Sequence, residues 1–366
     1  MKIECVKEKL GVAISKAEKI TGKNLTLPVL SCVLLEAKNN SLTIRATNLE
    51  LGIEVTLPVK VEREGTVAVP GGILSNFISN LQKDNNVKLE FAETNLIVST
   101  SSNTTLIKTF AHEDFPTIPR IEDGKTFKIE AQNFLKGLKS VWYSSATSSM
   151  KPELSSVYIY PEDDSIVFVA TDSFRLAEKK VKIKKGNEFT QILIPFKNIP
   201  EIMRGLEDAK GEVSVILNKN QISFSFDGVY LTSRVVDGTF PDYKQILPKE
   251  KKTEVIMLKQ DFVSALKLAN IFSDNFHQVR FKIEPKKKNF EIRTKNSDVG
   301  ENTNKIDGAL TGDDLEINFN FKYISDCFQS IDADSVSLEF TALNRPMVVR
   351  GVGDTSFLYL VMPMNK

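Results

Sequence analysis

The sequence consists of three copies of one unit, repeated at a nearly constant interval. In each copy, a β-branched and aromatic strand is followed by a polar turn and a second strand, which is typical of a β-hairpin. The three hairpin segments are Val33–Leu51, Val157–Leu176 and Phe281–Val299. Their first residues are 124 and 124 residues apart (157 − 33 and 281 − 157). Solenoid units contain only about 20–45 residues, so each copy is predicted to be a whole domain.

Each copy also contains two segments with helical periodicity. In the first segment, apolar residues recur at i, i+4 and i+7, which places them on one face of a helix. These residues are Leu10, Ile14 and Ala17; Phe134, Leu138 and Val141; and Phe262, Leu266 and Ala269. The second segments contain Leu74, Ile199 and Ile324, and two strand candidates follow each of them. Each copy is therefore predicted to hold two strand–helix–strand units, with helices on one face of a sheet.

The connections between copies repeat as well. Phe115-Pro116 and Phe240-Pro241 lie 125 residues apart (240 − 115), and each precedes a segment expected to be extended. Proline interrupts helices and central strands, so these dipeptides mark domain connections. The predicted domains span residues 1–121, 122–248 and 249–366. Domains related by a constant rotation can close into a ring, from one chain at about 120° per domain or from two chains at about 60°.

The composition is that of an ordinary globular protein, with 41% hydrophobic and 26% charged residues. No apolar run is long enough to span a membrane, and the amino terminus lacks the apolar segment of a signal peptide. Cys5, Cys32 and Cys327 form neither a metal nor a disulfide pattern, so a reducing cytoplasm is expected. Because the net charge is only +1, any anion binding must depend on where the charges lie.

The sequence contains no pattern of residues typical of catalysis. Neither His112 nor His277 belongs to a zinc-protease motif, and no Gly-x-Ser-x-Gly motif or complete phosphate-binding loop occurs. Asp172 is a candidate general base, but its counterparts in the other copies are Asn48 and Asn296, which favours turn capping. We therefore expect no enzyme activity, no cofactor and no metal site.

Basic residues recur on the predicted helices. Lys197 and Arg204 are seven residues apart and therefore share one helix face. Any one of these cations, considered alone, is explained equally simply as part of an ordinary solvated helix surface. If the same helix face pointed inward in every copy, however, a ring with no net charge would still have a positive lumen.

Several segments resemble the bacterial sliding clamps, the β subunits of DNA polymerase III. Val169–Leu176 is similar to the family's Ala-Thr-Asp-Gly-His-Arg-Leu segment, and Val236–Tyr243 to its Val-Asp-Gly-x-Phe-Pro-Asp-Tyr segment. Leu360–Met364 resembles the terminal Val-Val-Met-Pro-Met, and Leu27–Leu30 and Ala46–Glu50 match near the amino terminus. The resemblance covers the whole chain and agrees with its length and three copies.

The resemblance implies an α+β fold of three clamp domains, with sheets outside and helices inside, closing as a head-to-tail dimeric ring of six domains. It implies a non-catalytic processivity factor in the cytoplasm that encircles double-stranded DNA without sequence specificity and slides along it. The implied partners are the polymerase catalytic subunit, the clamp loader, and repair polymerases, ligase or mismatch-repair proteins, with no membrane contact.

The resemblance also implies three sets of site residues. A cleft for partner peptides would contain Leu154, Thr171, Ser173, Phe174, Arg175, Leu176, Pro241, Ile246, Leu360, Met362, Pro363 and Met364. DNA would be faced by Lys23, Lys136, Lys139, Lys197 and Arg204. The dimer interface would contain Leu106 and Ile107 of one chain and Ile271 and Phe272 of the other. Ser173-Phe174 replaces the family's Gly-His pair and Gln245 replaces an arginine, so the polar edge of the cleft is expected to differ.

Alternatives remain for these sites and for the function. The C-terminal segment is also compatible with a plain edge strand, and Ile271 and Phe272 with the core of their own domain. A β-rich hydrolase with an unrecognised site would be revealed by a screen for turnover. A monomeric adhesion or carbohydrate-binding protein would usually be exported, and the native mass would separate it from a dimer of 41.0 kDa chains.

Overall fold

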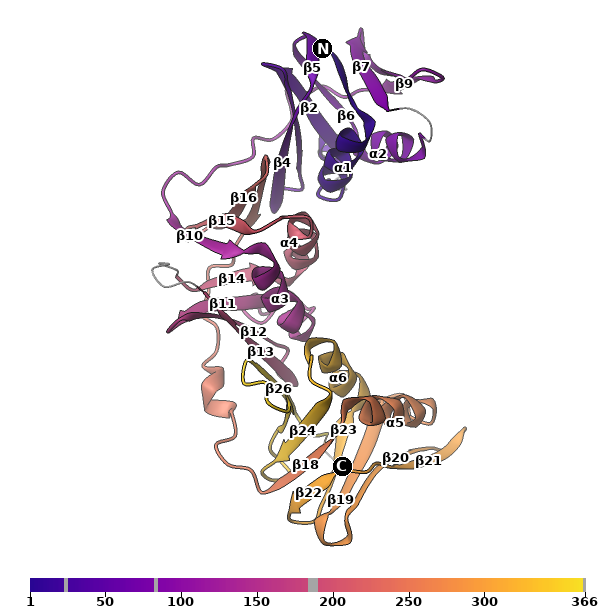
Figure 1. Ribbon diagram of the computed structural model, residues 1–366, viewed down its shortest axis with the longest axis vertical. Helices are drawn as coiled ribbons and strands as arrows, with labels where there is room; N and C mark the ends of the chain where they lie inside the picture. The colour runs from indigo at the N-terminus through magenta and orange to yellow at the C-terminus, as the bar shows by residue number, and fades with distance from the viewer. Residues whose placement is uncertain (23–25, 82–84, 184–189, 365–366) are drawn as a thin grey trace. The chain divides into compact units, whose positions relative to one another are not determined.

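The computed structural model describes residues 1–22, 26–81, 85–183 and 190–364 (Figure 1). They form two compact units. Unit 1 contains the described parts of Met1–Leu135 and Lys197–Asp237, and unit 2 those of Lys136–Lys185, Thr190–Phe196 and Gly238–Lys366. The middle sequence copy therefore contributes elements to both units.

The helices and the short 3-10 turns are distributed over all three copies. The α-helices are α1 (Lys7–Glu18), α2 (Gly71–Asn80), α3 (Ala131–Val141), α4 (Ile199–Leu206), α5 (Lys259–Ile271) and α6 (Phe321–Asp326). The 3-10 turns are η1 (Pro28–Ser31), η2 (Trp142–Ser144), η3 (Phe196–Asn198), η4 (Tyr243–Ile246), η5 (Pro285–Lys287) and η6 (Cys327–Ser330).

Unit 1 contains two antiparallel sheets. The five-stranded sheet has the order β5 (Lys60–Arg63), β1 (Lys2–Val6), β7 (Asn86–Ala92), β8 (Asn95–Ser99) and β9 (Thr104–Lys108). The eight-stranded sheet has the order β10 (Lys125–Glu130), β15 (Glu212–Leu217), β16 (Gln221–Phe226), β17 (Val229–Arg234), β4 (Leu51–Pro58), β3 (Ser41–Thr47), β2 (Cys32–Lys38) and β6 (Gly65–Pro70).

Unit 2 has the same organisation. Its nine-stranded sheet has the order β14 (Ile192–Pro195), β11 (Ser156–Glu162), β12 (Ser165–Thr171), β13 (Arg175–Lys182), β26 (Phe357–Val361), β25 (Met347–Gly351), β24 (Ser335–Phe340), β18 (Thr253–Leu258) and β22 (Ala309–Gly312). Its four-stranded sheet has the order β21 (Gly300–Lys305), β20 (Asn289–Asn296), β19 (Gln278–Glu284) and β23 (Leu315–Asn320).

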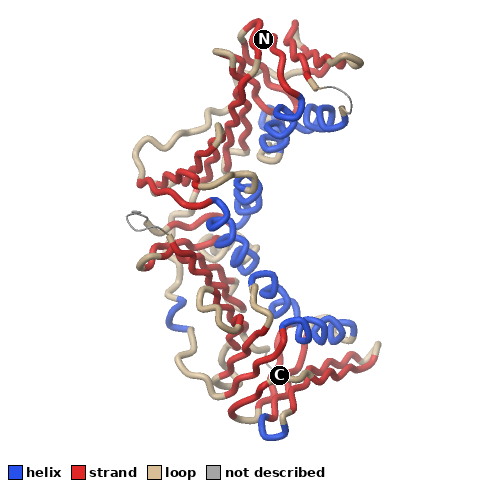
Figure 2. Tube along the Cα trace, in the orientation of Figure 1, coloured by secondary structure: helices blue, strands red, loops and turns tan. Residues whose placement is uncertain are grey.

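The repeat predicted from the sequence is present in the fold. The three hairpin segments contain the paired strands β2–β3, β11–β12 and β19–β20. The apolar residues predicted to share a helix face are buried in α1, α3 and α5. Helix α1 packs on β3 and β4 and against α2, while α5 packs on β20 and β21 and against α6. Within each unit, the α-helices lie on one face of the sheets (Figure 2).

Strand pairing joins neighbouring copies into continuous sheets. In unit 1, β4 of the first copy pairs with β17 of the second, and Leu51 lies opposite Ser233. In unit 2, β13 of the second copy pairs with β26 of the third (Figure 1). In that pair, Arg175 lies opposite Val361. We call these two places the first and second junctions. The C-terminal segment is therefore not an edge strand, because β26 is paired with β13 and β25.

The connection at the second junction is partly helical where an extended segment was expected. After Pro241 the chain forms η4, and the side chain of Tyr243 is buried. The hydroxyl of Tyr243 donates a hydrogen bond of 2.5 Å to Oε2 of Glu178 on β13. This buried contact anchors the connection to β13.

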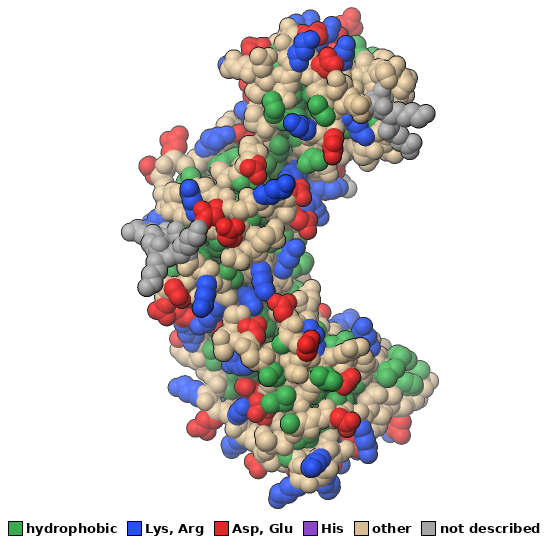
Figure 3. Space-filling view, in the orientation of Figure 1, with side chains coloured by type: hydrophobic (Ala, Val, Ile, Leu, Met, Phe, Trp, Pro, Cys, Tyr) green, Lys and Arg blue, Asp and Glu red, His purple; other side chains and the backbone are tan. Residues whose placement is uncertain are grey.

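The surface carries both signs of charge. On the face drawn in Figure 3, lysine and arginine side chains are interspersed with aspartate and glutamate. Among the described residues, no helix is long and apolar enough to cross a membrane. The residues that the structure describes also contain no cluster of three or more potential metal ligands.

Candidate functional site

A tight turn between β12 and β13 presents the first part of the candidate cleft. Thr171 Oγ1 accepts a hydrogen bond from the Ser173 amide (3.2 Å) and donates one to the Arg175 carbonyl (2.6 Å). Asp172 Oδ1 accepts from the amides of Phe174 (2.9 Å) and Arg175 (3.0 Å). The predicted capping role of Asp172 is thus confirmed. The turn holds Ser173 at φ 78° and leaves the Phe174 side chain 59% exposed.

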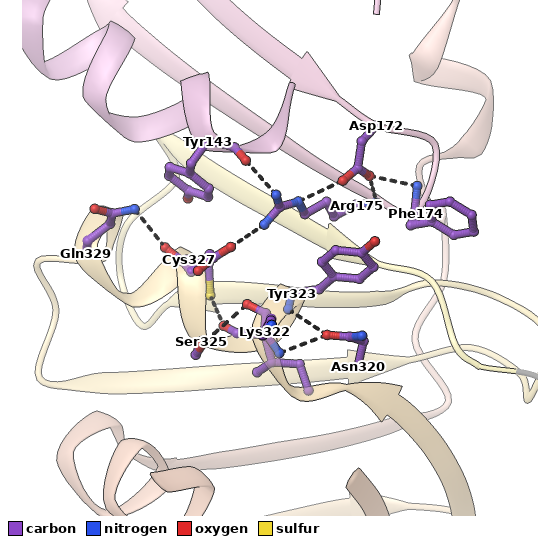
Figure 4. A network of polar contacts seen from close by, with 12 residues as sticks. Tyr143, Asp172, Phe174, Arg175, Asn320, Lys322, Tyr323, Ser325, Cys327 and Gln329 are labelled. Carbon is purple, nitrogen blue, oxygen red and sulfur yellow. Dashed lines mark hydrogen bonds and ion pairs between the residues drawn. The ribbon is translucent and has the colours of Figure 1, made fainter. Parts of the chain in front are cut away.

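Arg175 is the centre of a polar network that joins the second and third copies (Figure 4). Its Nε donates to Asp172 Oδ2 at 3.0 Å, and its Nη2 donates to the carbonyl oxygen of Tyr143 on η2 at 2.6 Å. Its Nη1 donates to Oδ2 of Asp326 on α6. The guanidinium also lies over the ring of Tyr323, 4.9 Å from its centroid. All three nitrogens of Arg175 are therefore engaged: Nε and Nη2 hold the side chain within the second copy, and Nη1 connects it to α6 of the third.

The charge on Arg175 is stabilised although the side chain is largely buried. Burial by itself lowers the pKa of the guanidinium. Interactions with Tyr359, Asp326 and Asp172 outweigh that effect, and the pKa is raised above its ordinary value. The side chain is thus a permanent cation that compensates two carboxylates.

Aromatic side chains surround this network. The Phe174 and Tyr323 rings are stacked, with centroids 6.2 Å apart and an interplanar angle of 16°. Asn320 caps α6, since its Oδ1 accepts from the amides of Lys322 (2.9 Å) and Tyr323 (3.3 Å), and its Nδ2 donates to the Phe276 carbonyl (3.1 Å). The Phe276 side chain is 72% exposed. The sequence motifs did not assign Tyr323, Phe276 or Asp326 to the site. The available signal was Asn320, because an asparagine directly before a helical segment predicts an N-cap and hence the start of α6.

The C-terminal segment crosses the turn. The Met362 amide donates to the Phe174 carbonyl (2.8 Å), and the Met364 amide donates to the Asn318 carbonyl (2.9 Å). Leu176 and Leu360 lie opposite each other in the β13–β26 pair and are both buried. Leu154 and Thr171 are also buried, whereas Met362, Pro363 and Met364 are half-buried. The structure thus joins the turn to the tail, above a buried apolar layer.

The residues from the connection lie at the surface. Pro241 and Ile246 are exposed, and Ile246 lines a cavity of about 270 Å³ together with Gln245, Thr341 and Arg345. The amide of Gln245 is engaged with Asp242, because Nε2 donates to Oδ2 at 2.8 Å.

Ion pairs hold the connection against the second copy. Lys244 Nζ lies 2.5 Å from Oε1 of Glu162, and Lys180 pairs with the other oxygen of that carboxylate. Hydrogen bonds from Lys180 and Lys244 hold the pKa of Glu162 below its ordinary value. A lowered carboxylate pKa contributes stability at neutral pH that is lost on acidification through the folded-state value.

The proposed DNA-facing residues are divided between the two units. Lys136 Nζ is 2.7 Å from Asp332, Lys197 Nζ is 3.6 Å from Glu50, and Arg204 pairs with Glu201. Lys139 lies in the last turn of α3, and Lys23 lies outside the described residues. The three ion pairs are at the surface, where such pairs contribute little and leave the cations accessible.

The proposed interface residues lie on or beside two sheet edges. Leu106 on the edge strand β9 is 59% exposed, whereas Ile107 on the same strand is buried. Ile271 ends α5 and is 63% exposed, which is not the core position considered as an alternative. Phe272 is half-buried. The second edge is β21, at the end of the four-stranded sheet.

The Arg175 network generates a prediction about stability. Arg175→Ala should lower the free energy of unfolding by about 3 kcal/mol, because it leaves Asp172 and Asp326 without their common cation. Arg175→Lys should recover only part of the lost free energy of unfolding, since an ammonium group cannot reproduce the planar set of guanidinium donors. Urea unfolding measures the change. Arg63→Ala, which removes an exposed arginine 3.5 Å from Glu90, is the matched control and should change stability by less than about 1 kcal/mol. Equal effects of Arg175→Ala and the control would contradict this role.

Comparison with known proteins covers the whole chain. Residues 1–119, 128–242 and 244–365 match the models of the N-terminal, central and C-terminal domains of the DNA polymerase III beta subunit. The chain is 25% identical to the beta sliding clamp of Synechococcus elongatus and 26% identical to that of Synechocystis, over 100% of this chain and 99% of each relative.

Solved structures agree with these matches. The DNA polymerase III beta subunit from Thermotoga maritima is 27% identical, with a TM-score of 0.94 over 100% of this chain and 99% of that one. A sliding clamp from Bartonella birtlesii bound to griselimycin is 26% identical, with a TM-score of 0.94 over 100% of both chains. These matches identify a sliding-clamp family and support neither of the two alternative functions, a hydrolase or an adhesion protein. The three domain matches and the repeated fold show that the chain belongs to the DNA polymerase III beta subunits, the bacterial sliding clamps, which are non-catalytic processivity factors of DNA replication.

Proposed function

We propose that two copies of this chain close head to tail into a six-domain ring around duplex DNA and tether the replicative polymerase and other partners. The observation that carries the proposal is the pair of exposed sheet edges, β9 in unit 1 and β21 in unit 2. An unpaired strand edge is a template for another chain, and proteins cover or pair such edges. If β9 of each copy paired with β21 of the other, two equivalent interfaces would form and all four edges would be paired, which gives a closed dimer. The domains would be those predicted at residues 1–121, 122–248 and 249–366.

Apolar side chains beside these edges support the same contact. Leu106 projects from β9, and Ile271 and Phe272 lie at the end of α5, which packs on β21. Exposed aliphatic residues next to an open edge are unfavourable in water and favourable in an interface. Glu301 of β21 and Lys108 of β9 carry opposite charges and would add charge pairing at the rim.

The charge distribution suits a topological hold on DNA. The net charge is +1, and three of the proposed DNA-facing cations share their charge with a neighbouring carboxylate. Such a surface gives weak, salt-sensitive phosphate contacts that position DNA without reading its bases. A closed ring needs no stronger contact to remain on DNA and slide.

The partner cleft would lie at the second junction. Its buried layer contains Leu176 and Leu360, and its rim contains Phe174, Met362 and Met364. We propose that it receives a short segment with a glutamine and a Leu-Phe pair. Methionine adapts to several ligands, which suits exchange among a polymerase, a clamp loader and repair proteins. Two buried apolar anchors contribute roughly 1.5–3 kcal/mol each, and ordering the peptide opposes them, so roughly micromolar affinity is expected.

The first test concerns closure of the dimer. Replacing Ile271 and Phe272 with alanine should give folded monomers, because it removes roughly 4–8 kcal/mol of apolar packing at each interface. Light scattering gives the mass, and circular dichroism checks the fold. Leu258→Ala, which removes an exposed leucine at the end of β18, is the control and should stay dimeric. A double variant that remains dimeric at sub-micromolar concentration would exclude this interface.

The second test concerns encirclement. Once placed on nicked circular DNA by a clamp loader, the protein should remain bound in salt that removes direct binders, because its retention is topological. Linearising the circle should release it, since the ring can slide off an end. Gel filtration of labelled protein with each DNA measures retention. Equal retention on circular and linear DNA would show that the hold is chemical.

The third test concerns the cleft. Deleting Met362–Lys366 should abolish binding of a Gln-x-x-Leu-Phe peptide, because it removes the rim residues held by the Phe174 and Asn318 carbonyls. Calorimetry measures affinity, and light scattering should show an intact dimer. Ile73→Ala removes an exposed isoleucine of α2 in unit 1 and should leave affinity unchanged. If the truncated protein binds the peptide as before, the cleft lies elsewhere.

A further inference from the structure

The first junction reproduces the turn of the second junction bond for bond. Thr47 Oγ1 accepts from the Leu49 amide (3.0 Å) and donates to the Leu51 carbonyl (2.7 Å). Asn48 Oδ1 accepts from the amides of Glu50 (3.0 Å) and Leu51 (2.8 Å). Thr171 and Asp172 make the corresponding four bonds. Leu49 is held at φ 74°, as Ser173 is at φ 78°.

The strand that crosses the turn is also equivalent. At the first junction, the Arg234 amide donates to the Glu50 carbonyl at 2.9 Å. At the second, the Met362 amide donates to the Phe174 carbonyl at 2.8 Å. The two bonds occupy the same register, directly after the paired residues Leu51–Ser233 and Arg175–Val361. Arg234 therefore stands at the first junction where Met362 stands at the second.

A cavity of about 490 Å³ is present at the first junction, within unit 1. Its apolar wall is formed by Leu49, which is 44% exposed, and by Pro116 and Pro119 of the connection. Thr47, Gln221 and Arg234 provide its polar wall. The volume falls within the range of sites that hold small ligands and peptide side chains.

The charges in this cavity favour an anion. Its acidic lining residue, Glu50, is 3.6 Å from Lys197 and is therefore already compensated. Arg234 is exposed, and its guanidinium makes no hydrogen bond or ion pair within the described part of the chain. A guanidinium presents a planar fork of donors that matches a carboxylate. The apolar wall beside it suits an aliphatic side chain rather than a sugar–phosphate backbone.

We propose that the first junction is a second docking site, which takes an extended acidic peptide of a partner protein. A carboxylate of the peptide pairs with Arg234, and a neighbouring aliphatic side chain packs against Leu49, Pro116 and Pro119. The substitution of arginine for methionine changes the specificity from an apolar segment to an acidic one. This inference rests on the proposed function, because it takes the second junction as a peptide site.

The test uses the full chain and two probe peptides, acetyl-Ser-Leu-Asp-Leu-Ser-amide and its Asp→Asn counterpart. Nuclear magnetic resonance of methyl-labelled protein gives both affinity and location. The Asp peptide should shift the Leu49 methyl signals and bind about tenfold or more tightly than the Asn peptide, because one charge-assisted pair is at stake. Arg234→Met should remove this difference, whereas Arg63→Met, at an exposed arginine of β5, should preserve it. Circular dichroism confirms that each variant is folded.

Two further arms separate this site from the proposed cleft and from DNA binding. The Asp peptide should bind equally well to protein lacking Met362–Lys366 and to protein saturated with a Gln-x-x-Leu-Phe peptide. Loss of binding in either case would place the acidic peptide in the second junction and overturn the inference, while leaving the cleft intact. Absence of any binding, or equal affinity in Arg234→Met, would also overturn it. If Arg234→Met weakens binding of short duplex DNA and leaves binding of the Asp peptide unchanged, Arg234 belongs to the DNA surface and the inference is overturned.

Discussion

Backbone hydrogen bonding across the copies is the constraint on which the rest of this structure depends. β4 pairs with β17, and β13 pairs with β26, so each sheet continues from one sequence copy into the next. The buried apolar faces of these strands allow only one register of the ladder, which fixes the paired strands of the two copies against each other at each junction. The compact units accordingly follow the sheets and not the copies, and the middle copy is shared between them.

The same backbone frame supports different chemistry at its two junctions. At the second junction, Arg175 and Leu176 follow the turn, and the arginine fixes α6 through Asp326. At the first, the corresponding residues are Leu51 and Gly52, and a Cβ at Gly52 would lie 2.8 Å from the Ile118 side chain. The glycine therefore lets the connection approach β4 closely. Repetition preserved the hydrogen bonds of the turn, while the side chains around it diverged.

The charge pattern is compatible with the topological hold on DNA that we propose. Its surface mixes both signs, and the described helical cations Lys136, Lys197 and Arg204 have acidic neighbours. In the proposed closed ring, weak and salt-sensitive phosphate contacts would be sufficient, because closure around the duplex would retain the protein. Under the proposed function, selection of partners would fall to the two junctions, where buried apolar layers lie beside exposed side chains such as Phe174 and Arg234.

The sequence by itself determined the three copies, the hairpins, the buried helix faces and the capping role of Asp172, because periodicity and turn chemistry act between residues close in the chain. The family motifs also pointed to the turn and the tail of the candidate cleft. Only the tertiary structure decided that β26 is an interior strand and that Arg175 meets Asp326, 151 residues away. It alone brought Tyr323 onto Phe174 and placed Arg234 where Met362 stands in the other junction. A local pattern specifies that a strand edge or a charge needs a partner, but which distant residue supplies it depends on how the sheets continue from copy to copy.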